Sequence, residues 1–157
     1  MSAILSTQNL VKKYGYKIVS NNISLTINKG DIYGFVGKNG AGKTTFMRQV
    51  LGLAFPDSGE ITLFGGEPLN TARKKIGSLI EFPSIYKNCT AYENMKRMAI
   101  LTGSSDKSVR KILDFVGLGN TGNKKAGQFS LGMRQRLGIA MALLGNPELL
   151  ILEEPIN

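Results

Sequence analysis

The sequence predicts a protein of the α/β class with a single core. Short apolar runs that are typical of strands alternate with amphipathic segments that are typical of helices. One apolar run, residues 32–36, leads directly into a glycine-rich turn, and a helical segment begins after that turn near Lys43. A chain of 157 residues buries roughly 70% of the surface that its unfolded form exposes, which is enough for one core and rarely for two.

The first half of the chain is predicted to be rich in strands. Residues 18–27 alternate apolar and polar side chains, as a half-buried strand does, while residues 32–36 are apolar throughout, as in a strand covered on both faces. The first helix places Phe46, Val50 and Leu53 on one stripe. We predict strands at residues 4–11, 18–27, 32–36 and 60–64, and a helix at 43–53.

From residue 83 onward the pattern becomes mostly helical. Thr90 is a predicted N-cap, because Glu93 follows three residues later as its capping-box partner. Residues 83–128 form a predicted helical insertion within one domain that spans residues 1–157. We predict strands at residues 76–80 and 149–152, and helices at 90–101, 106–116 and 130–144.

Composition excludes several kinds of chemistry. The chain has no histidine, so it holds no Ser-His-Asp triad, no histidine base and no histidine-ligated zinc. Its one cysteine, Cys89, excludes a disulfide within the chain and a CxxC metal cluster. No secretory signal or membrane-spanning run is expected. Lysine and arginine number 20 against 11 acidic residues, which gives a net charge of +9 and an attraction for polyanions.

The strongest motif is the segment from Gly37 to Thr44, which reads GKNGAGKT and fits the phosphate-loop pattern GxxxxGK[ST]. Its glycines allow successive backbone N–H groups to face one anion at the positive end of the following helix. Lys43 then reaches the β- and γ-phosphates, and the Thr44 hydroxyl coordinates Mg²⁺. The alternative is a glycine-rich turn followed by a Lys-Thr pair without function. We predict nucleotide contacts from Gly37, Asn39, Gly40, Ala41, Gly42, Lys43, Thr44 and Thr45.

Two further motifs follow this loop in a characteristic order. Residues 129–136 read FSLGMRQR, and the apolar run 149–152 ends in Glu153-Glu154-Pro155. Together with GKNGAGKTT, they make essentially the whole chain resemble the nucleotide-binding domain of ATP-binding cassette (ABC) transporters, closest to the ATPase subunits of bacitracin- and lantibiotic-type peptide exporters. The resemblance implies a P-loop NTPase core of mainly parallel strands, an antiparallel N-terminal β subdomain and a helical insertion.

The resemblance also assigns roles to residues outside the phosphate loop. Tyr14 stands where the family stacks an aromatic ring on adenine; the alternative is a turn tyrosine that packs on the sheet. Glu81 stands where the family usually has a glutamine that contacts Mg²⁺ and the attacking water, and the alternative is a plain strand-to-helix loop. Ser130 and Gly132 remain from the signature LSGGQ, which grips the γ-phosphate of ATP held by the opposite subunit; the alternative is an ordinary serine N-cap.

The acidic pair matches the end of the Walker B strand. Glu154 corresponds to the catalytic glutamate that polarises water, and Glu153 replaces the aspartate of the family as a Mg²⁺ ligand. Since Mg²⁺ requires near-octahedral geometry with ligands at about 2.0–2.1 Å, the extra methylene of Glu153 is expected to weaken metal handling. The alternative is two acids at a solvent-exposed strand end. The implied cofactors are ATP and Mg²⁺, with Thr44, Glu81 and Glu153 as metal ligands.

The resemblance implies a transmembrane permease subunit and a second nucleotide-binding domain as partners, the latter in an ATP-dependent head-to-tail dimer. It places the protein in the cytoplasm, peripheral on the inner face of the cell membrane. Family domains continue beyond this strand, so we expect an incomplete domain, and a nucleotide-binding module with little or no hydrolysis is the alternative function.

A nucleic-acid-associated ATPase is a further alternative, because the chain is basic. The bases are scattered, however, and no basic strand is interleaved with aromatic residues, so we expect no nucleic-acid partner. Residues 73–75, the one run of three consecutive bases, are expected to form a solvated or lipid-facing patch.

Overall fold

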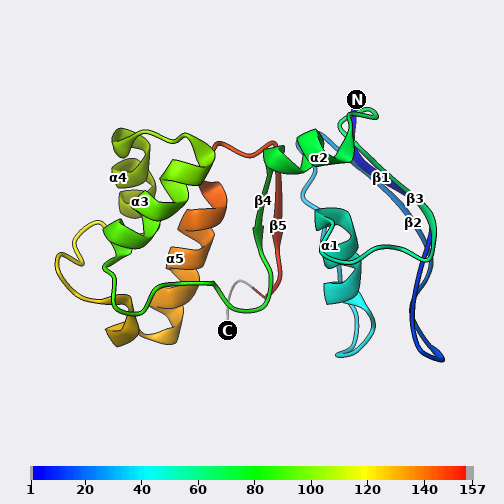
Figure 1. Cartoon of the computed structure of the whole chain (residues 1–157), viewed down its shortest axis with the longest axis horizontal. Helices are drawn as coiled ribbons and strands as arrows, with labels where there is room; N and C mark the ends of the chain where they lie inside the picture. The colour runs from blue at the N-terminus through cyan, green and yellow to red at the C-terminus, as the bar shows by residue number, and fades with distance from the viewer. Residues whose placement is uncertain (1, 155–157) are drawn as a thin grey trace. The chain divides into compact units, whose positions relative to one another are not determined.

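The computed structural model describes residues 2–154 of the chain. These residues divide between two compact units, Met1–Lys74 and Lys75–Asn157, and each unit is described by itself. Figure 1 shows the course of the chain through both of them.

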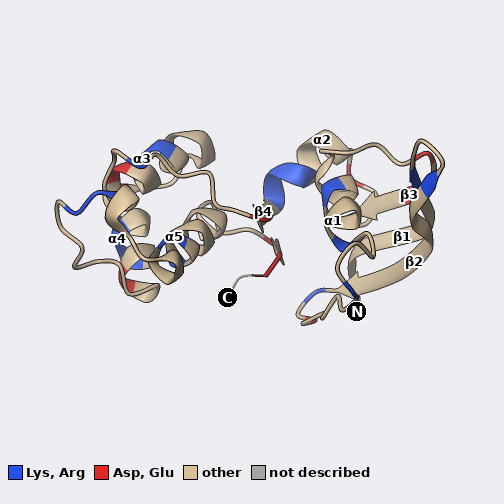
Figure 2. Cartoon of the chain, turned by 90° about the horizontal axis from the view of Figure 1, so that it is seen from below, with Lys and Arg blue, Asp and Glu red and all other residues tan. Residues whose placement is uncertain are grey.

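Unit 1 is built on a three-stranded antiparallel sheet. Strand β1 (Ala3–Tyr14) and strand β2 (Lys17–Asn28) form a long hairpin, and β3 (Ser58–Leu63) pairs with the other edge of β1. The strand order is therefore β2-β1-β3, with β1 in the centre (Figure 2). The register places Leu5 opposite both Ile27 and Leu63, and the side chains of Leu5 and Leu63 are fully or almost fully buried. The antiparallel N-terminal part of the predicted fold is thus confirmed.

Helix α1 (Lys43–Leu51) begins where the sequence predicts and ends earlier. It buries Phe46, Gln49 and Val50. Gly52 follows in the left-handed conformation, with φ of 77°, and this glycine ends the helix. Leu53 therefore lies beyond the helix and is 70% exposed, which corrects its placement on the apolar stripe with Phe46 and Val50. A short helix α2 (Leu69–Ala72) and a 3₁₀ turn at Arg73–Lys75 follow β3.

The predicted strand at residues 32–36 is wrong for this structure. No strand within residues 2–154 pairs with this segment, and the side chains of Ile32 and Val36 are almost wholly exposed. The ring of Phe35 stacks on the ring of Phe46, at 4.9 Å between centroids. A fully apolar strand requires hydrogen-bonded neighbours and covered faces, and the three-stranded sheet of unit 1 does not extend to this segment.

Unit 2 combines a parallel strand pair with three helices. Strand β4 (Ile76–Leu79) pairs in parallel with β5 (Leu149–Leu152), so that Leu79 lies opposite Leu152. Helices α3 (Ala91–Thr102), α4 (Asp106–Phe115) and α5 (Leu131–Leu143) surround a hydrophobic core. The buried side chains of that core include Met95, Val109, Leu113, Leu118, Phe129 and Leu137. These elements confirm the predicted helices and strands within one or two residues.

Capping interactions explain where the helices of unit 2 begin. Thr90 accepts a hydrogen bond from the Glu93 N–H, and the Glu93 carboxylate accepts one from the Thr90 N–H, as the capping box predicts. Ser105 caps α4 and Ser130 caps α5 in the same way. Among residues 2–154, no helix is both long and apolar enough to cross a bilayer.

Candidate functional site

Residues 37–41 form an exposed loop that leads through the half-buried Gly42 into the start of α1 at Lys43. Gly40 and Gly42 both adopt positive φ values, 79° and 91°, which glycine tolerates at little cost. Gly42 also packs closely against β2, because a Cβ atom there would lie 1.9 Å from the Val19 carbonyl oxygen. The Phe46 N–H donates to the Gly42 carbonyl at 2.8 Å and forms the first hydrogen bond of the helix. Only glycine fits at position 42 without displacing β2.

The start of α1 has the features of an anion site. Its N-cap residue, Gly42, makes no side-chain capping bond, and its first turn contains no acidic residue. Backbone N–H groups at the positive end of the helix are therefore not occupied by a side-chain cap. Lys43 lies across the loop, because its ammonium donates to the carbonyl oxygens of Gly37 at 2.7 Å and Lys38 at 3.1 Å. The loop and its lysine thus fit a phosphate group in charge and in hydrogen-bonding chemistry.

The opposite end of α1 is held by residues that the sequence analysis did not assign to it. The Arg73 guanidinium donates to the carbonyl oxygens of Val50 at 3.0 Å and Gln49 at 3.4 Å. It occupies the space where Gly52 has no side chain, since a Cβ at Gly52 would lie 2.6 Å from the guanidinium carbon. Arg73 is partly buried, so the expectation of a solvated or lipid-facing patch is wrong for this residue.

A buried polar pair connects the other side of α1 to β2. Gln49 is fully buried, and its side-chain carbonyl accepts a hydrogen bond from the Ser20 hydroxyl at 3.3 Å. Ser20 follows Val19, the residue that Gly42 touches. A glutamine inside an apolar helix stripe was the one available signal of this contact, and the sequence analysis did not use it.

Tyr14 lies at the end of β1, where it pairs with Lys17 across the hairpin. Its side chain is 53% exposed. The Lys12 ammonium stands 5.3 Å from the ring centroid and also forms an ion pair with Asp57 at 3.3 Å. A hydrogen bond from the Lys13 N–H holds the pKa of the Asp57 carboxyl below its usual range, and a hydrogen bond from the Lys12 ammonium lowers it further. The lysine therefore connects Tyr14 to a carboxylate that the sequence analysis did not single out.

In unit 2 the three predicted acidic residues, Glu81, Glu153 and Glu154, follow the carboxyl ends of the two parallel strands. Glu153 directly follows β5, and its N–H donates to the Leu79 carbonyl at the end of β4, at 2.8 Å. Glu81 comes two residues after β4 and therefore lies at the same edge. The side chain of Glu153 is buried, whereas Glu81 and Glu154 are exposed and have positive φ values of 58° and 43°. Carboxylates that follow the carboxyl ends of parallel strands are chemically suited to a hard cation. Among residues 2–154, however, no three acidic or cysteine side chains lie close enough together to hold a metal ion as the structure stands.

Helix α5 approaches this edge closely. A Cβ at Gly138 would lie 2.6 Å from Pro83 Cβ, so the absence of a side chain allows α5 to contact the segment that follows Glu81. At the start of the helix, Ser130 is exposed and its hydroxyl accepts from the Met133 N–H at 3.2 Å. Ser130 is therefore an N-cap in this structure. Open space surrounds the missing Cβ of Gly132, which leaves the backbone there accessible to a partner.

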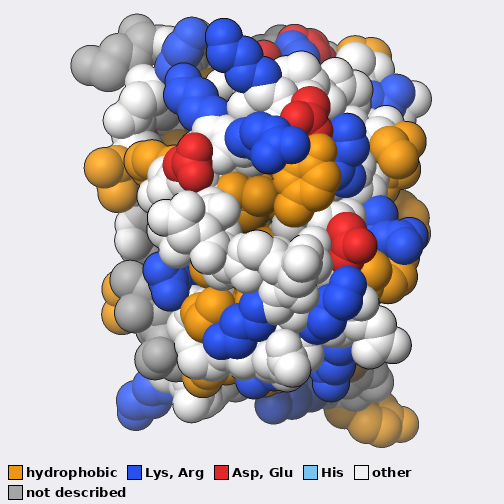
Figure 3. All heavy atoms as spheres, turned by 90° about the vertical axis from the view of Figure 1, so that its left-hand side faces the viewer, with side chains coloured by type: hydrophobic (Ala, Val, Ile, Leu, Met, Phe, Trp, Pro, Cys, Tyr) orange, Lys and Arg blue, Asp and Glu red, His pale blue; other side chains and the backbone are white. Residues whose placement is uncertain are grey.

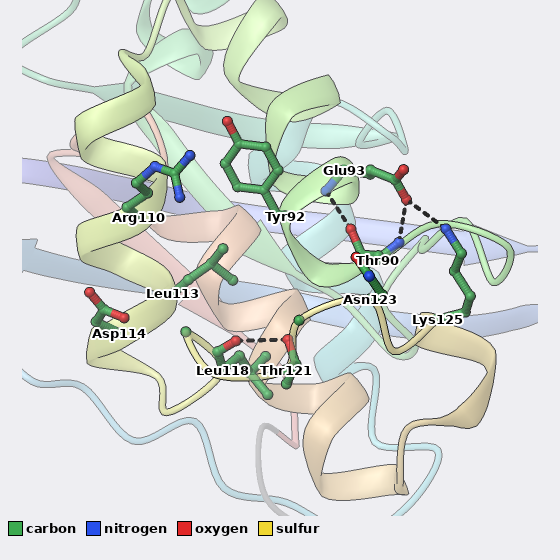
Figure 4. A pocket seen from close by; sticks show the side chains of 12 residues that line it. Thr90, Tyr92, Glu93, Arg110, Leu113, Asp114, Leu118, Thr121, Asn123 and Lys125 are labelled. Carbon is green, nitrogen blue, oxygen red and sulfur yellow. Dashed lines mark hydrogen bonds and ion pairs between the residues drawn. The ribbon is translucent and has the colours of Figure 1, made fainter.

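A hollow of about 580 Å³ between α3, α4 and the loop after α4 belongs to none of the predicted sites (Figure 4). Its charged rim is largely paired. The Glu93 carboxylate contacts Lys125 at 3.2 Å, and Arg110 contacts Asp106 at 2.9 Å. The Thr90 N–H, together with Lys125, holds the pKa of Glu93 below its ordinary value. These bonds stabilise the corner between the helices and the loop.

Comparison with known proteins agrees with this geometry. Residues 20–157 match the family model described as "ABC transporter". The chain is 50% identical to the bacitracin transport ATP-binding protein BcrA of Enterococcus faecalis, with 100% of this chain and 52% of that protein covered. It is 47% identical to the lantibiotic transport ATP-binding protein SrtF of Streptococcus pyogenes, with 98% and 67% covered. The chain thus spans about half the length of the bacitracin relative.

A solved structure also shares the fold. An ATP-binding cassette, described as a dimer in a post-hydrolysis state bound to ADP and phosphate, matches with a TM-score of 0.82 and 26% identity. The match covers 96% of this chain and 74% of that one. The loop geometry, the order of the motifs and these similarities lead to one conclusion: the chain belongs to the ABC transporter family and has its P-loop ATPase fold.

Proposed function

We propose that this chain is the ATP-binding subunit of an ABC transporter and couples ATP binding and hydrolysis to export of, or resistance to, a peptide antibiotic. The observation that carries the proposal is the glycine loop at the uncapped start of α1, where Gly42 packs against the Val19 carbonyl. The named relatives transport bacitracin and a lantibiotic, which supports a peptide antibiotic as the cargo.

Each predicted residue has a defined task in this proposal. Backbone N–H groups of residues 37–45 bind the phosphates, and the Lys43 ammonium exchanges its bonds to the loop carbonyls for bonds to phosphate oxygens. Tyr14 stacks on the adenine ring. The Glu154 carboxylate accepts a hydrogen bond from the attacking water and so orients it.

The proposal also assigns Mg²⁺ ligands and partner contacts. Thr44 supplies a hydroxyl oxygen, and Glu81 and Glu153 supply carboxylate oxygens, which are donors that Mg²⁺ prefers. When bound, Mg²⁺ neutralises the charge that develops on the phosphates. Ser130 and Gly132 act on the nucleotide of a second domain in a head-to-tail dimer, and a transmembrane permease holds the subunit at the cytoplasmic face of the membrane. The dimeric cassette with ADP and phosphate supports the dimer.

Binding without hydrolysis is the second candidate. Glu153 stands where the family has aspartate, and its buried side chain has limited room to adjust. Phosphoryl transfer depends on positioning and charge, so a displaced ligand lowers the rate more than the affinity.

Calorimetry with ATP and Mg²⁺ tests the binding step. We expect at least tenfold weaker binding for Lys43→Ala, because the lysine contributes a charge-assisted contact to phosphate. The exposed Lys29 offers a matched control, and Lys29→Ala should bind as the unaltered chain does. Absence of binding by the well-folded chain would overturn the proposal. Phosphate release compared with Glu154→Gln then separates the two candidates, because equal rates would show that the chain binds without hydrolysing.

A further inference from the structure

The helical part of unit 2 carries a strong excess of positive charge. Residues 84–136 contain ten lysines and arginines and three acidic residues. Basic residues are spread over α3, α4, α5 and the loop after α4 (Figure 2), and hydrophobic side chains lie among the basic ones on the face drawn in Figure 3.

Two of the three acidic residues are already paired inside this unit. Glu93 contacts Lys125 at 3.2 Å. Asp106 contacts both Lys96 at 3.2 Å and Arg110 at 2.9 Å. The remaining basic side chains of α4, Lys107 and Lys111, are exposed and form no ion pair among the residues that the structure describes. Their charge is therefore available to an external anion.

A groove of about 550 Å³ lies beside this charge, between α4 and the turn that follows α5. Ser104 connects its two walls, because the Ser104 hydroxyl accepts from the Gly145 N–H at 3.0 Å. The same hydroxyl lies 2.7 Å from the Thr102 hydroxyl at the end of α3. These bonds fix the groove between three helical segments, so it is part of the folded unit and not a gap between mobile loops.

The lining of the groove separates into a polar part and an apolar part. Lys111 offers an ammonium donor to an anion, and the Ser105 and Ser108 hydroxyls, which share a hydrogen bond at 3.0 Å between their oxygens, leave one O–H to donate. Phe115 and Leu143 provide apolar surface. Phe115 is 79% exposed although it ends the same face of α4 that carries Lys111, four residues earlier. Such an arrangement suits a ligand that has a phosphate at one end and hydrocarbon at the other.

We propose that this groove binds the headgroup of an acidic phospholipid, so that unit 2 contacts the membrane surface directly. The lysines attract the anionic surface, and the O–H that the Ser105–Ser108 pair leaves free donates to a phosphodiester oxygen. Phe115 enters the interface between headgroups and acyl chains, where an aromatic ring is favoured. A nucleic acid or an acidic peptide would use the lysines and leave the adjoining apolar surface in water. The contact goes beyond the proposed function and requires no nucleotide.

Co-sedimentation of the full chain with vesicles tests this contact. The protein should bind phosphatidylglycerol vesicles, bind pure phosphatidylcholine vesicles at least tenfold more weakly, and dissociate from the former in 0.5 M salt. Lys107→Gln combined with Lys111→Gln should weaken binding roughly 25-fold, since each lysine near an anionic surface contributes about fivefold. Phe115→Ser should weaken it severalfold without abolishing the salt dependence.

The matched control is Lys17→Gln combined with Lys29→Gln, which removes the same charge from exposed positions of unit 1. If this control loses as much binding as the variant in α4, or if all variants bind equally, the groove is not the lipid site. Equal binding to neutral vesicles would show non-specific adsorption and would overturn the proposal, as would displacement from vesicles by an acidic peptide at stoichiometric amounts. Circular dichroism confirms that each variant is folded, and calorimetry with ATP reports separately on the nucleotide site.

Discussion

At the scale of single residues, Gly42 connects local backbone conformation to the candidate nucleotide site. Its φ of 91° and its contact with the Val19 carbonyl are two separate reasons for glycine. Gly40 has only the first reason, because open space surrounds the position of its missing Cβ. The two glycines of one loop therefore allow conformational strain to be distinguished from steric exclusion.

We predict that Gly42→Ala destabilises the chain by more than about 2 kcal/mol, since a methyl group must displace β2 in addition to adopting a strained conformation. Gly40→Ala should cost about 1 kcal/mol, from the conformation alone. Urea unfolding followed by circular dichroism measures both values. Equal losses for the two variants would show that the close approach to Val19 carries no energetic weight.

Asp106 provides a prediction about acid stability. The Asp106 carboxylate accepts hydrogen bonds from the Tyr92 hydroxyl, which has the largest effect, and from Arg110 and Lys96. Together these bonds lower the pKa of Asp106 from 3.8 to about 2. Because the folded state favours the ionised form, its contribution is complete above about pH 4. That contribution is lost as the pH falls from 4 towards 2.

The urea midpoint of Asp106→Asn should therefore lie below that of the unaltered chain at pH 5, and the difference should narrow at pH 2.5. Asp114→Asn serves as the control, because Asp114 lies exposed on the same helix and forms no ion pair among the described residues. A constant difference across this pH range would contradict the role assigned to the Asp106 carboxylate.

At the scale of secondary-structure elements, α1 depends on a residue far along the chain. Arg73 donates to the last carbonyl groups of the helix, which no later residue of the helix can satisfy. We predict that Arg73→Leu lowers stability by about 1.5–3 kcal/mol, the usual contribution of hydrogen bonds from a charged donor. Lys74→Leu, at the exposed neighbouring position, should change stability by less than about 0.5 kcal/mol. Thermal unfolding compares the two, and similar losses would refute the capping role of Arg73.

The sequence predicted elements well where local signals decide them. The capping box of Thr90 and Glu93 and the serine cap at Ser130 define helix starts through residues within one turn, and the structure confirms both. The sequence failed where distant contacts decide. Residues 32–36 have the composition of a buried strand, yet pairing requires partners that composition does not reveal. Likewise, nothing adjacent to Arg73 signals that its side chain reaches α1.

The residues of the candidate site likewise separate into those that local sequence signals predict and those that depend on distant contacts. The spacing of Gly37–Thr44 was sufficient to predict a loop at a helix start, because a single turn of backbone builds it. The family resemblance predicts Glu81 and Glu153 as ligands of one metal, and the parallel register of β4 and β5 places both residues after the carboxyl ends of adjacent strands. Asp57 and Gln49 were missed, since their contacts cross between elements.

At the scale of the whole molecule, nucleotide binding should leave a selective pattern of protection from hydrogen exchange. We predict that ATP with Mg²⁺ slows exchange at residues 37–51, where the loop and α1 lie, and leaves residues 106–115 of α4 unchanged. Slower exchange at residues 149–154 would support Glu153 and Glu154 as nucleotide-site residues. Protection of the loop without any effect at 149–154 would contradict that assignment. The Lys43→Ala variant at the same ATP concentration gives the exchange rates expected when nucleotide binding is weakened.

The exposed side chains of Ile32 and Val36 have a practical consequence for work with the isolated chain. Bare hydrocarbon on a folded protein favours self-association, and the tendency rises with concentration. We expect the purified chain to enhance the fluorescence of an anilinonaphthalene dye under native conditions, and Ile32→Ser with Val36→Ser to reduce this signal and to improve recovery after refolding. Solubility engineering would therefore begin in the few residues ahead of the phosphate loop.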